Sequence, residues 1–249
     1  MADSEKNIYS GVLSGNMLKL LACASMLIDH IGLILFPGVT ALRAVGRLAM
    51  PLFAFTFAEG CFYTRSKRKH FLLVLAIGLI TSAGFSVAEG RLTGDIMITL
   101  SLSCLIIYSL DGLKCSAFER RGKKTALYAA AFAASVVFAV WLCCFSGADI
   151  DYGIAGVLLP VTVRLLDFGS YGAKGMLASL YSVAAMILPF AINLLVLSAL
   201  YGIVQFYCLL SLFPILLYSG RRGKARLKYF FYVFYPAHLA LLAGIWLIL

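Results

Sequence analysis

Nine apolar runs, separated by charged or Gly/Pro-marked breaks, constrain the fold of this chain more than any other feature. Most are close to the roughly 20 residues that an α-helix needs to cross a bilayer. The composition, 62% hydrophobic and 13% charged over 249 residues, excludes a water-soluble globule. We predict an all-α fold, a polytopic integral membrane helical bundle with about nine transmembrane helices, of which the fourth, sixth and eighth are short and either tilted or partly re-entrant. The runs cover approximately residues 17–37, 44–63, 70–88, 95–112, 125–146, 152–168, 176–199, 202–218 and 229–248.

The distribution of basic residues predicts the orientation of the chain. The formal charge of +10 is divided among short loops, which is typical of membrane topology and not of a nucleic-acid-binding groove. With nine alternating spans, all of the 21 Lys and Arg except Arg43, Arg47 and Arg91 fall on one side. The positive-inside rule then places the N-terminus in the cytoplasm. We expect a polar cytoplasmic segment over residues 1–16, no cleavable signal peptide, and a single transmembrane domain over residues 17–249.

Seven cysteines and three histidines give no sign of a metal centre or of a disulfide framework. Six of the cysteines fall within apolar segments, and no pair has the spacing of a zinc site. We interpret them as small buried side chains and expect no metal ion. A P-loop, a GxGxxG turn after a strand and a GxSxG elbow are also missing from the sequence.

Polar residues inside two apolar runs are the first candidates for chemistry, because an ionised group at the centre of a membrane helix costs roughly 2.5–3.5 kcal/mol. Asp29 and His30 lie past the middle of the first run, and Arg43 and Arg47 lie on one helical face at the outer start of the second. Asp29 could pair with Arg43 or Arg47 as a clamp between helices. Alternatively, the two guanidinium groups bind an anionic group. For His30, which titrates near neutral pH, we favour proton transfer.

Further polar groups lie in the second and last runs and in the outer loops. Glu59, near the cytoplasmic end of the second run, either balances the charge of the basic stretch 65–69 or has a functional role. Tyr235 and His238 share one helical face with Tyr232, and a histidine near the middle of a membrane helix is a functional candidate. We expect the carboxylates of the outer loops to be solvated: Asp95, Asp149 and Asp151.

Five ordered motifs resemble the TraX family, which is named for a membrane protein associated with N-terminal acetylation of conjugative pilin. They are LKLLACASMLIDHIG, LRAVGRLAMPLFAFTFAEGCFYTRS, DYGIAGVLLP, QFYCLLSLFPILLYSGRRG and YFFYVFYPAHLALL. The resemblance extends from about residue 18 to the C-terminus, with little signal over residues 113–150. TraX proteins are similar to a wider group of transmembrane acyltransferases, which includes the heparan-alpha-glucosaminide acetyltransferases and the acyltransferase-3 enzymes and uses cytoplasmic acyl-CoA.

The resemblance implies transfer of an acetyl group from acetyl-CoA to an amine or hydroxyl. Because a thioester is already activated, the protein must supply a base for the acceptor and positive groups for the oxyanion and the phosphates of coenzyme A. His30 is the candidate base or the residue that is transiently acylated, and Asp29 and Arg47 are the further catalytic candidates. Binding of the acyl donor is assigned to Arg43, Arg65, Arg68, Tyr235 and His238.

Expected partners are acyl-CoA, the lipid bilayer and an envelope acceptor, which stays open among a pilin N-terminus, a glycan and a lipid; no nucleic acid is expected. The expected location is the bacterial cytoplasmic (inner) membrane. Two other functions stay open. One is a transporter in which Asp29, His30, Arg47 and His238 line a proton or anion path, although the half-repeats typical of many transporters are not evident. The other is a non-catalytic scaffold for envelope assembly.

Overall fold

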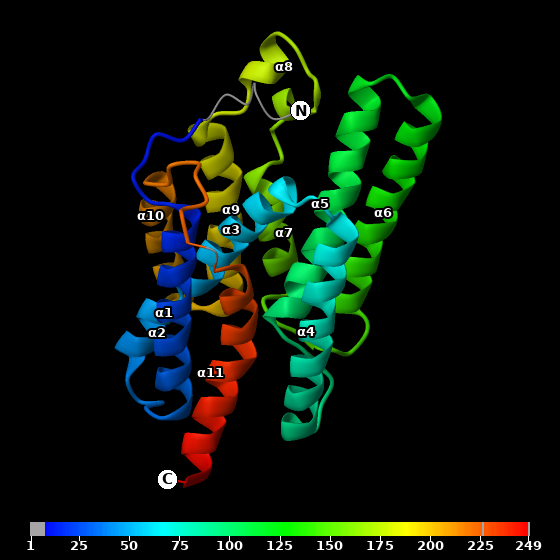
Figure 1. Cartoon of the computed structure of the whole chain (residues 1–249). Helices are drawn as coiled ribbons and strands as arrows, with labels where there is room; N and C mark the ends of the chain where they lie inside the picture. Colours follow the sequence, from blue (N-terminus) through cyan, green and yellow to red (C-terminus); the bar gives the residue numbers. More distant parts are fainter. Residues whose placement is uncertain (1–7, 226, 249) are drawn as a thin grey trace. The chain divides into compact units, whose positions relative to one another are not determined.

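The computed structural model describes residues 8–225 and 227–248, and in this part of the chain the protein is almost entirely helical (Figure 1). The all-α prediction is thereby confirmed. The longer helices are α1 (Gly15–Ile34), α3 (Ala49–Tyr63), α4 (Lys67–Glu89), α5 (Ile96–Phe118), α6 (Gly122–Cys144), α9 (Val183–Tyr201) and α11 (Lys228–Ile248). The shorter elements are α2 (Thr40–Gly46), α7 (Gly153–Val163), α8 (Met176–Ser179), α10 (Leu212–Leu216), the 3-10 helices η1 (Gly169–Tyr171) and η2 (Ile203–Ser211), and the strands β1 (Thr93–Gly94) and β2 (Asp149–Ile150).

Each predicted apolar run corresponds to a helical segment among the described residues. Within residues 8–225 and 227–248, seven segments are long and apolar enough to cross a membrane, and α2 with α3 forms one of them. The prediction that the fourth run is short is wrong, because α5 has 23 residues and continues past Asp111, which pairs with Lys67, and Lys114, which binds backbone carbonyl oxygens. The sixth run is short, as predicted, and so is the eighth, which consists of η2 and α10. The chain is a multi-pass membrane protein.

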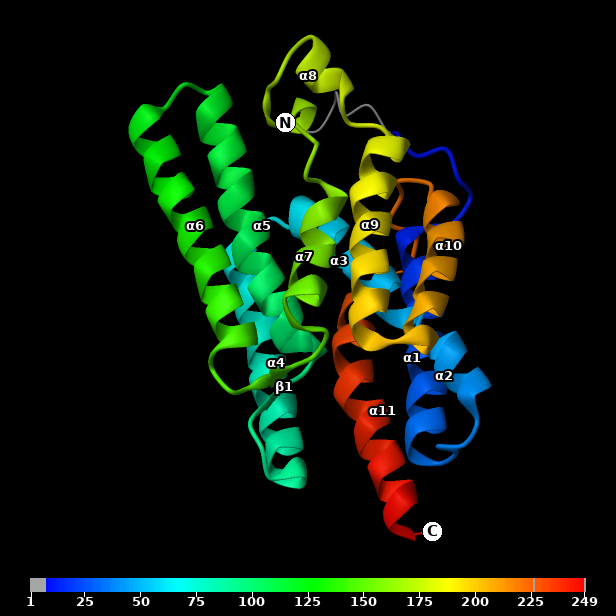
Figure 2. The same cartoon turned by 180° about the vertical axis from the view of Figure 1, so that it is seen from behind.

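The helices form two compact units (Figure 2). The first unit takes residues 57–193 and centres on α5, which packs against α4, α6 and α7. The second unit takes the described residues before 57 and after 193; in it α1 packs against α2 and α11, and η2 packs against α2. The single domain expected over residues 17–249 stays a prediction.

Helix α7 has only 11 residues and leads from strand β2 to the contact between Arg164 and Lys114 of α5. Just before α7, strand β2 pairs in parallel with β1, next to the start of α5. Ser103 of α5 donates a hydrogen bond to the Val157 carbonyl of α7 at 2.7 Å, and Lys114, a further 11 residues along α5, binds the Arg164 carbonyl at 2.8 Å. Helix α7 therefore runs alongside α5 in the same direction.

The eighth segment makes a similar passage in the second unit. It begins at η2, where Gln205 contacts Arg47, and ends after α10, where Tyr218 forms a parallel bridge with Leu13 just before α1. A 3-10 helix rises about 2.0 Å per residue against about 1.5 Å for an α-helix. The nine residues of η2 therefore extend further than nine α-helical residues would.

Short-range signals set several helix ends. The side chains of Ser14 and Ser66 each accept a hydrogen bond from the backbone N–H three residues later, which makes them the N-caps of α1 and α4. Helix α4 ends at Gly90, whose φ of 67° lies in the left-handed region that favours glycine. Serine and glycine at these positions are signals that can be read from the sequence.

Asp95 is the N-cap of α5 and is not solvated, so the prediction for this residue is wrong. Its carboxylate accepts hydrogen bonds from the N–H groups of Met97 and Ile98 at 3.1 and 3.2 Å and from the hydroxyl of Thr81, and the residue is only 3% exposed. Asp149, in contrast, is exposed and pairs with Arg91 at 2.6 Å. A capping carboxylate is satisfied by backbone donors, and this is why Asp95 can be buried.

Helix α6 presents large apolar side chains outward from the first unit. Leu127, Val137, Phe138 and Trp141 are 67, 68, 45 and 51% exposed. Exposing these apolar side chains to water would be unfavourable, whereas contact with lipid tails is favourable.

Candidate functional site

Asp29, near the C-terminal end of α1, binds both arginines of the second apolar run. Its carboxylate accepts from Arg43 Nη1 at 2.8 Å and from Arg47 Nη2 at 3.0 and 3.1 Å. The side chains of Asp29 and Arg47 are only 15 and 13% exposed. The clamp that the sequence suggested therefore forms, and it uses both arginines.

Two glycines let α1 and α2 approach each other at this point. A Cβ at Gly46 would overlap the Asp29 carboxylate, and a Cβ at Gly32 would overlap the side chain of Leu42. The Gly-Arg pair at 46 and 47 thus has a steric reason, because Gly46 leaves room for the carboxylate that Arg47 binds.

Arg47 also joins this cluster to η2. Its Nη1 donates to Oε1 of Gln205 at 3.1 Å, and Gln205 is 2% exposed. Its Nε lies 3.4 Å from the Arg43 carbonyl oxygen. Two guanidinium groups and one carboxylate leave the cluster with a net positive charge, so it favours a further anionic group nearby.

His30 meets His238 of α11, which lies 208 residues later in the chain. Nδ1 of His30 and Nε2 of His238 are 3.0 Å apart, and the ring of His238 stacks on Phe234 with centroids 4.9 Å apart. Tyr235 lies beside the pair, with its ring centroid 5.9 Å from that of His238, and both residues are buried. His30 and His238, which come from the first and last apolar runs, are therefore partners.

The backbone of α11 determines how the two rings share their protons. Nδ1 of His238 lies 2.8 Å from the Phe234 carbonyl oxygen. A carbonyl only accepts hydrogen bonds, so this nitrogen carries a hydrogen. In neutral His238, Nε2 is then the acceptor, and Nδ1–H of His30 is the donor. Nε2 of His30 is left with a lone pair, which is the form that a general base requires.

Arg65 and Arg68 belong to the first unit and are separate from this cluster in the chain. They lie just before α4 and in its first turn, and both are exposed. Their contact with the nucleotide phosphates of an acyl donor stays a prediction.

Comparison of the sequence with known proteins shows the family to which the chain belongs. The family model described as "TraX protein" matches residues 14–246. The chain belongs to the TraX family. A relative named "Probable fimbrial assembly protein FimC, serogroup H1", from Dichelobacter nodosus, is 29% identical over 258 residues, which cover 93% of this chain and 95% of the relative. The "Uncharacterized protein RP591" of Rickettsia prowazekii (strain Madrid E) is 31% identical over 153 residues, covering 61% of this chain and 54% of the relative. No solved structure matches the chain.

In this TraX protein four of the five motifs quoted from the sequence contribute residues to one site. Asp29 and His30 come from the first motif, Arg47 from the second, Gln205 from the fourth and His238 from the fifth. The contacts above join them in the second unit. Four motifs therefore each supply a residue to one polar cluster, which their order along the chain does not reveal.

Glu59, in the EG of the second motif, binds Arg164, just after α7. Its Oε1 accepts from Arg164 Nε at 3.0 Å, while Arg164 Nη1 donates to Asp167 at 2.8 Å. The guanidinium of Arg164 also lies 3.6 Å from the centroid of the Phe62 ring. Arg164 is one of the basic residues expected on the cytoplasmic side, but its side chain is only 11% exposed.

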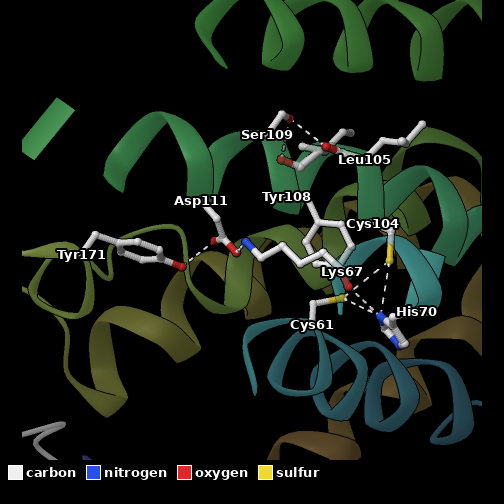
Figure 3. A network of polar contacts seen from close by, with 10 residues as sticks. Cys61, Lys67, His70, Cys104, Leu105, Tyr108, Ser109, Asp111 and Tyr171 are labelled. Atoms are coloured by element: carbon white, nitrogen blue, oxygen red, sulfur yellow. Dashed lines mark hydrogen bonds and ion pairs between the residues drawn. The ribbon is translucent and has the colours of Figure 1, made fainter. Parts of the chain in front are cut away.

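Lys114 and Asp111 of α5 extend this network in the TraX protein. Nζ of Lys114 donates to the carbonyls of Arg164, Leu165 and Asp167 at 2.8, 2.8 and 3.1 Å, so that it closes the C-terminal end of α7. Asp111 accepts from Lys67 at 2.9 Å and from Tyr171 at 2.5 Å (Figure 3). The network has no net charge, and it connects α3, α4, α5 and the segment after α7. Its acidic and basic members are equal in number: Glu59, Asp111 and Asp167, and Lys67, Lys114 and Arg164. The sequence did not indicate this network, because its members lie in separate segments of the chain.

Proposed function

We propose that this TraX protein is a membrane-embedded acyltransferase that transfers an acetyl group from acetyl-CoA to an amine or hydroxyl of an envelope acceptor. The observation that carries the proposal is the pair of His30 and His238 beside the cluster of Asp29, Arg43 and Arg47. This site combines a basic nitrogen of His30 with the net positive charge of the cluster. Acyl transfer from a thioester requires both.

In the proposed reaction, Nε2 of His30 takes a proton from the acceptor, whose nitrogen or oxygen attacks the thioester carbonyl carbon. The carbon–sulfur bond then breaks, and the leaving thiolate takes the proton back from His30. His238 holds the His30 ring through the hydrogen bond at Nδ1. Arg47 and Arg43 stabilise the negative charge that develops on the carbonyl oxygen. In a two-step variant, Nε2 of His30 attacks the thioester carbonyl carbon, the carbon–sulfur bond breaks and coenzyme A leaves as the thiolate. The acceptor then attacks the acetyl carbon, the bond to Nε2 breaks, and Nε2 takes the acceptor proton.

The proposed setting is the cytoplasmic membrane of a bacterium, with the N-terminus on the cytoplasmic side. The basic residues Arg65 and Arg68 would then attract the phosphates of coenzyme A from the cytoplasm. The fimbrial assembly name of the Dichelobacter relative favours a pilin-related acceptor over a glycan or a lipid.

Purified protein incubated with labelled acetyl-CoA tests this function. We expect an acetylated enzyme, hydrolysis, or transfer to an envelope fraction. His30→Ala should lower the rate by about 10²–10⁴-fold because it removes the base. His238→Ala should lower it by roughly 5–10-fold, the value of one hydrogen bond of about 1 kcal/mol, and should shift the pH profile. Leu33→Ala, an exposed position on the same helix as His30, is the matched control and should not change the rate.

Three outcomes would contradict the proposal. The first is wild type that gives neither acetyl-enzyme nor hydrolysis nor transfer. The second is full activity of His30→Ala. The third is proton-coupled flux in liposomes without acyl-CoA, which would favour a transporter. A missing thermal shift with acetyl-CoA would favour a non-catalytic assembly protein.

A further inference from the structure

Three side chains that the sequence left unconnected converge in the first unit. They are Cys61 in the last turn of α3, His70 in the first turn of α4, and Cys104 in the middle of α5. Figure 3 shows the two sulfur atoms and the imidazole pointing toward one another from their separate helices. The cluster belongs to the first unit, whereas the histidine pair belongs to the second, and the cluster takes no part in the proposed acyl transfer.

The distances bring three donor atoms around one point. The two Sγ atoms are 3.7 Å apart, and Nδ1 of His70 lies 4.0 Å from Cys61 Sγ and 3.9 Å from Cys104 Sγ. Both cysteines are completely buried, whereas His70 is partly exposed. An ion could therefore reach the cluster from the side of His70 and then be enclosed.

These distances fit a tetrahedral metal site better than a disulfide. Zinc–sulfur bonds of about 2.3 Å and zinc–nitrogen bonds of about 2.0–2.1 Å give a sulfur–sulfur edge of about 3.8 Å and sulfur–nitrogen edges of about 3.6 Å. The sulfur–sulfur separation already matches, and the imidazole has to approach by only a few tenths of an ångström. A disulfide would need the sulfurs to approach to about 2.05 Å.

Two thiols in simple contact would show the same sulfur–sulfur separation. The position of the third donor atom, Nδ1 of His70, distinguishes a metal site from such a contact. Nδ1 of His70 is nearly equidistant from both sulfurs, as a shared ligand position requires. The hydroxyl of Tyr108 lies 2.6 Å from the same Nδ1 and is the nearest group for a fourth position.

We propose that Cys61, His70 and Cys104 bind a zinc ion that fastens α3, α4 and α5 together. Thiolate and imidazole ligands suit zinc. On binding, the two thiols release their protons to solvent and the Tyr108 hydroxyl moves away from Nδ1. A divalent ion with two thiolates and a neutral imidazole carries no net charge, which suits a buried site in a membrane protein. The proposal departs from our expectation of no metal, since ligands 9 and 34 residues apart do not form a zinc-binding motif.

Metal analysis of the purified full chain tests the site. Wild type, kept reduced and loaded with zinc, should retain one ion per chain after dialysis. The same protein loaded with cobalt(II) should show sulfur-to-cobalt charge-transfer absorption. The double variant Cys61→Ser/Cys104→Ser should lose both signals. Cys23→Ser/Cys208→Ser removes two buried cysteines of the second unit and should keep both.

The wild-type measurement decides the question even if the double variant does not fold. Wild type that retains no zinc and gives no cobalt–sulfur absorption overturns the proposal. So does full retention of zinc by Cys61→Ser/Cys104→Ser. A disulfide between Cys61 and Cys104 in protein kept under reducing agent, detected as two thiols missing from a maleimide count, also overturns it and identifies a redox pair instead.

Discussion

At the scale of single residues, Arg47 shows how a costly charge is kept inside an apolar run. Its guanidinium binds the Asp29 carboxylate through Nη2 and the Gln205 side chain through Nη1. A lysine would keep the charge but could not make this planar set of contacts. The arginine therefore connects α1, the start of α3 and η2 through one side chain.

We predict that Asp29→Asn destabilises the protein by about 3–5 kcal/mol, because it leaves two largely buried guanidinium groups without their carboxylate. The measurement is the thermal unfolding midpoint in detergent. Asp149→Asn is the matched control: it makes the same change in an exposed pair with Arg91 and should alter the midpoint little. Equal midpoints for wild type and Asp29→Asn would mean that the ion pair is not needed for folding.

At the scale of elements, the approach of α1 to α2 depends on the absence of a side chain at Gly46 and Gly32. Helices bring polar groups into contact only when their backbones are close enough, and here the Asp29 carboxylate occupies the space that a Cβ at Gly46 would take. The position of the ion pair is therefore set by a small residue on the partner helix.

Gly46→Ala should destabilise the second unit by roughly 1–3 kcal/mol through overpacking against Asp29. It should also lower acetyl transfer, because Arg47 would lose its place. Gly38→Ala is the control, since a Cβ there meets nothing within 4 Å. We would compare unfolding midpoints and transfer rates; a Gly46→Ala protein that matches Gly38→Ala in both would refute the steric argument.

The loops joined by β1 and β2 should make the stability of the first unit depend on pH. Asp151 is an exposed residue, but partial desolvation of its carboxylate, together with the neighbouring carboxylates of Asp95, Asp149 and Glu89, raises its pKa to about 7. The unfolded chain releases this proton near pH 4. Between pH 4 and 7 the folded state thus binds more protons, so its stability falls as the pH rises through this range.

We expect the unfolding midpoint of wild type to decrease from pH 5 to pH 8, and Asp151→Asn to show a smaller decrease. Glu119→Gln, an exposed acid at the other end of the first unit, should leave the wild-type dependence unchanged. Identical pH dependence of wild type and Asp151→Asn would show that Asp151 does not hold a proton in the folded state.

At the scale of the whole molecule, the topology depends on whether the short segments, such as α7, cross the membrane. The chain enters α7 at the β1–β2 end of the first unit and leaves it where Lys114 binds the Arg164 carbonyl. If α7 did not cross the membrane, the loop that contains Lys174 would lie on the same side as β1 and β2. The passage through α7 instead puts this loop with the basic residues near the end of α5, as the positive-inside rule predicts.

A membrane-impermeant maleimide applied to intact cells separates these topologies. In a background without Cys115 and Cys144, both exposed, Arg91→Cys should be labelled from outside, and Lys174→Cys only after the membrane is permeabilised. Labelling of both Arg91→Cys and Lys174→Cys in intact cells would show that α7 does not cross. Labelling of Lys174→Cys together with protection of Arg91→Cys would reverse the predicted orientation.

The sequence by itself determined that the chain is a helical membrane protein of the TraX family and that Asp29, His30, Arg47 and His238 are out of place in apolar runs. Length and hydropathy are local properties of a helix, and the motifs can be read in order. The sequence also offered Arg43 and Arg47 as partners of Asp29, because the three lie close in the chain, but it left open whether the arginines bind Asp29 or another anionic group.

Only the tertiary structure decided the partners of residues far apart. His30 meets His238, Glu59 meets Arg164, and Cys61 meets His70 and Cys104. Periodicity tells which face of a helix is polar, but the contact between two faces depends on the rotation and depth of both helices. Those are set by packing, such as the room that Gly46 leaves for Asp29, and packing is a property of the folded molecule.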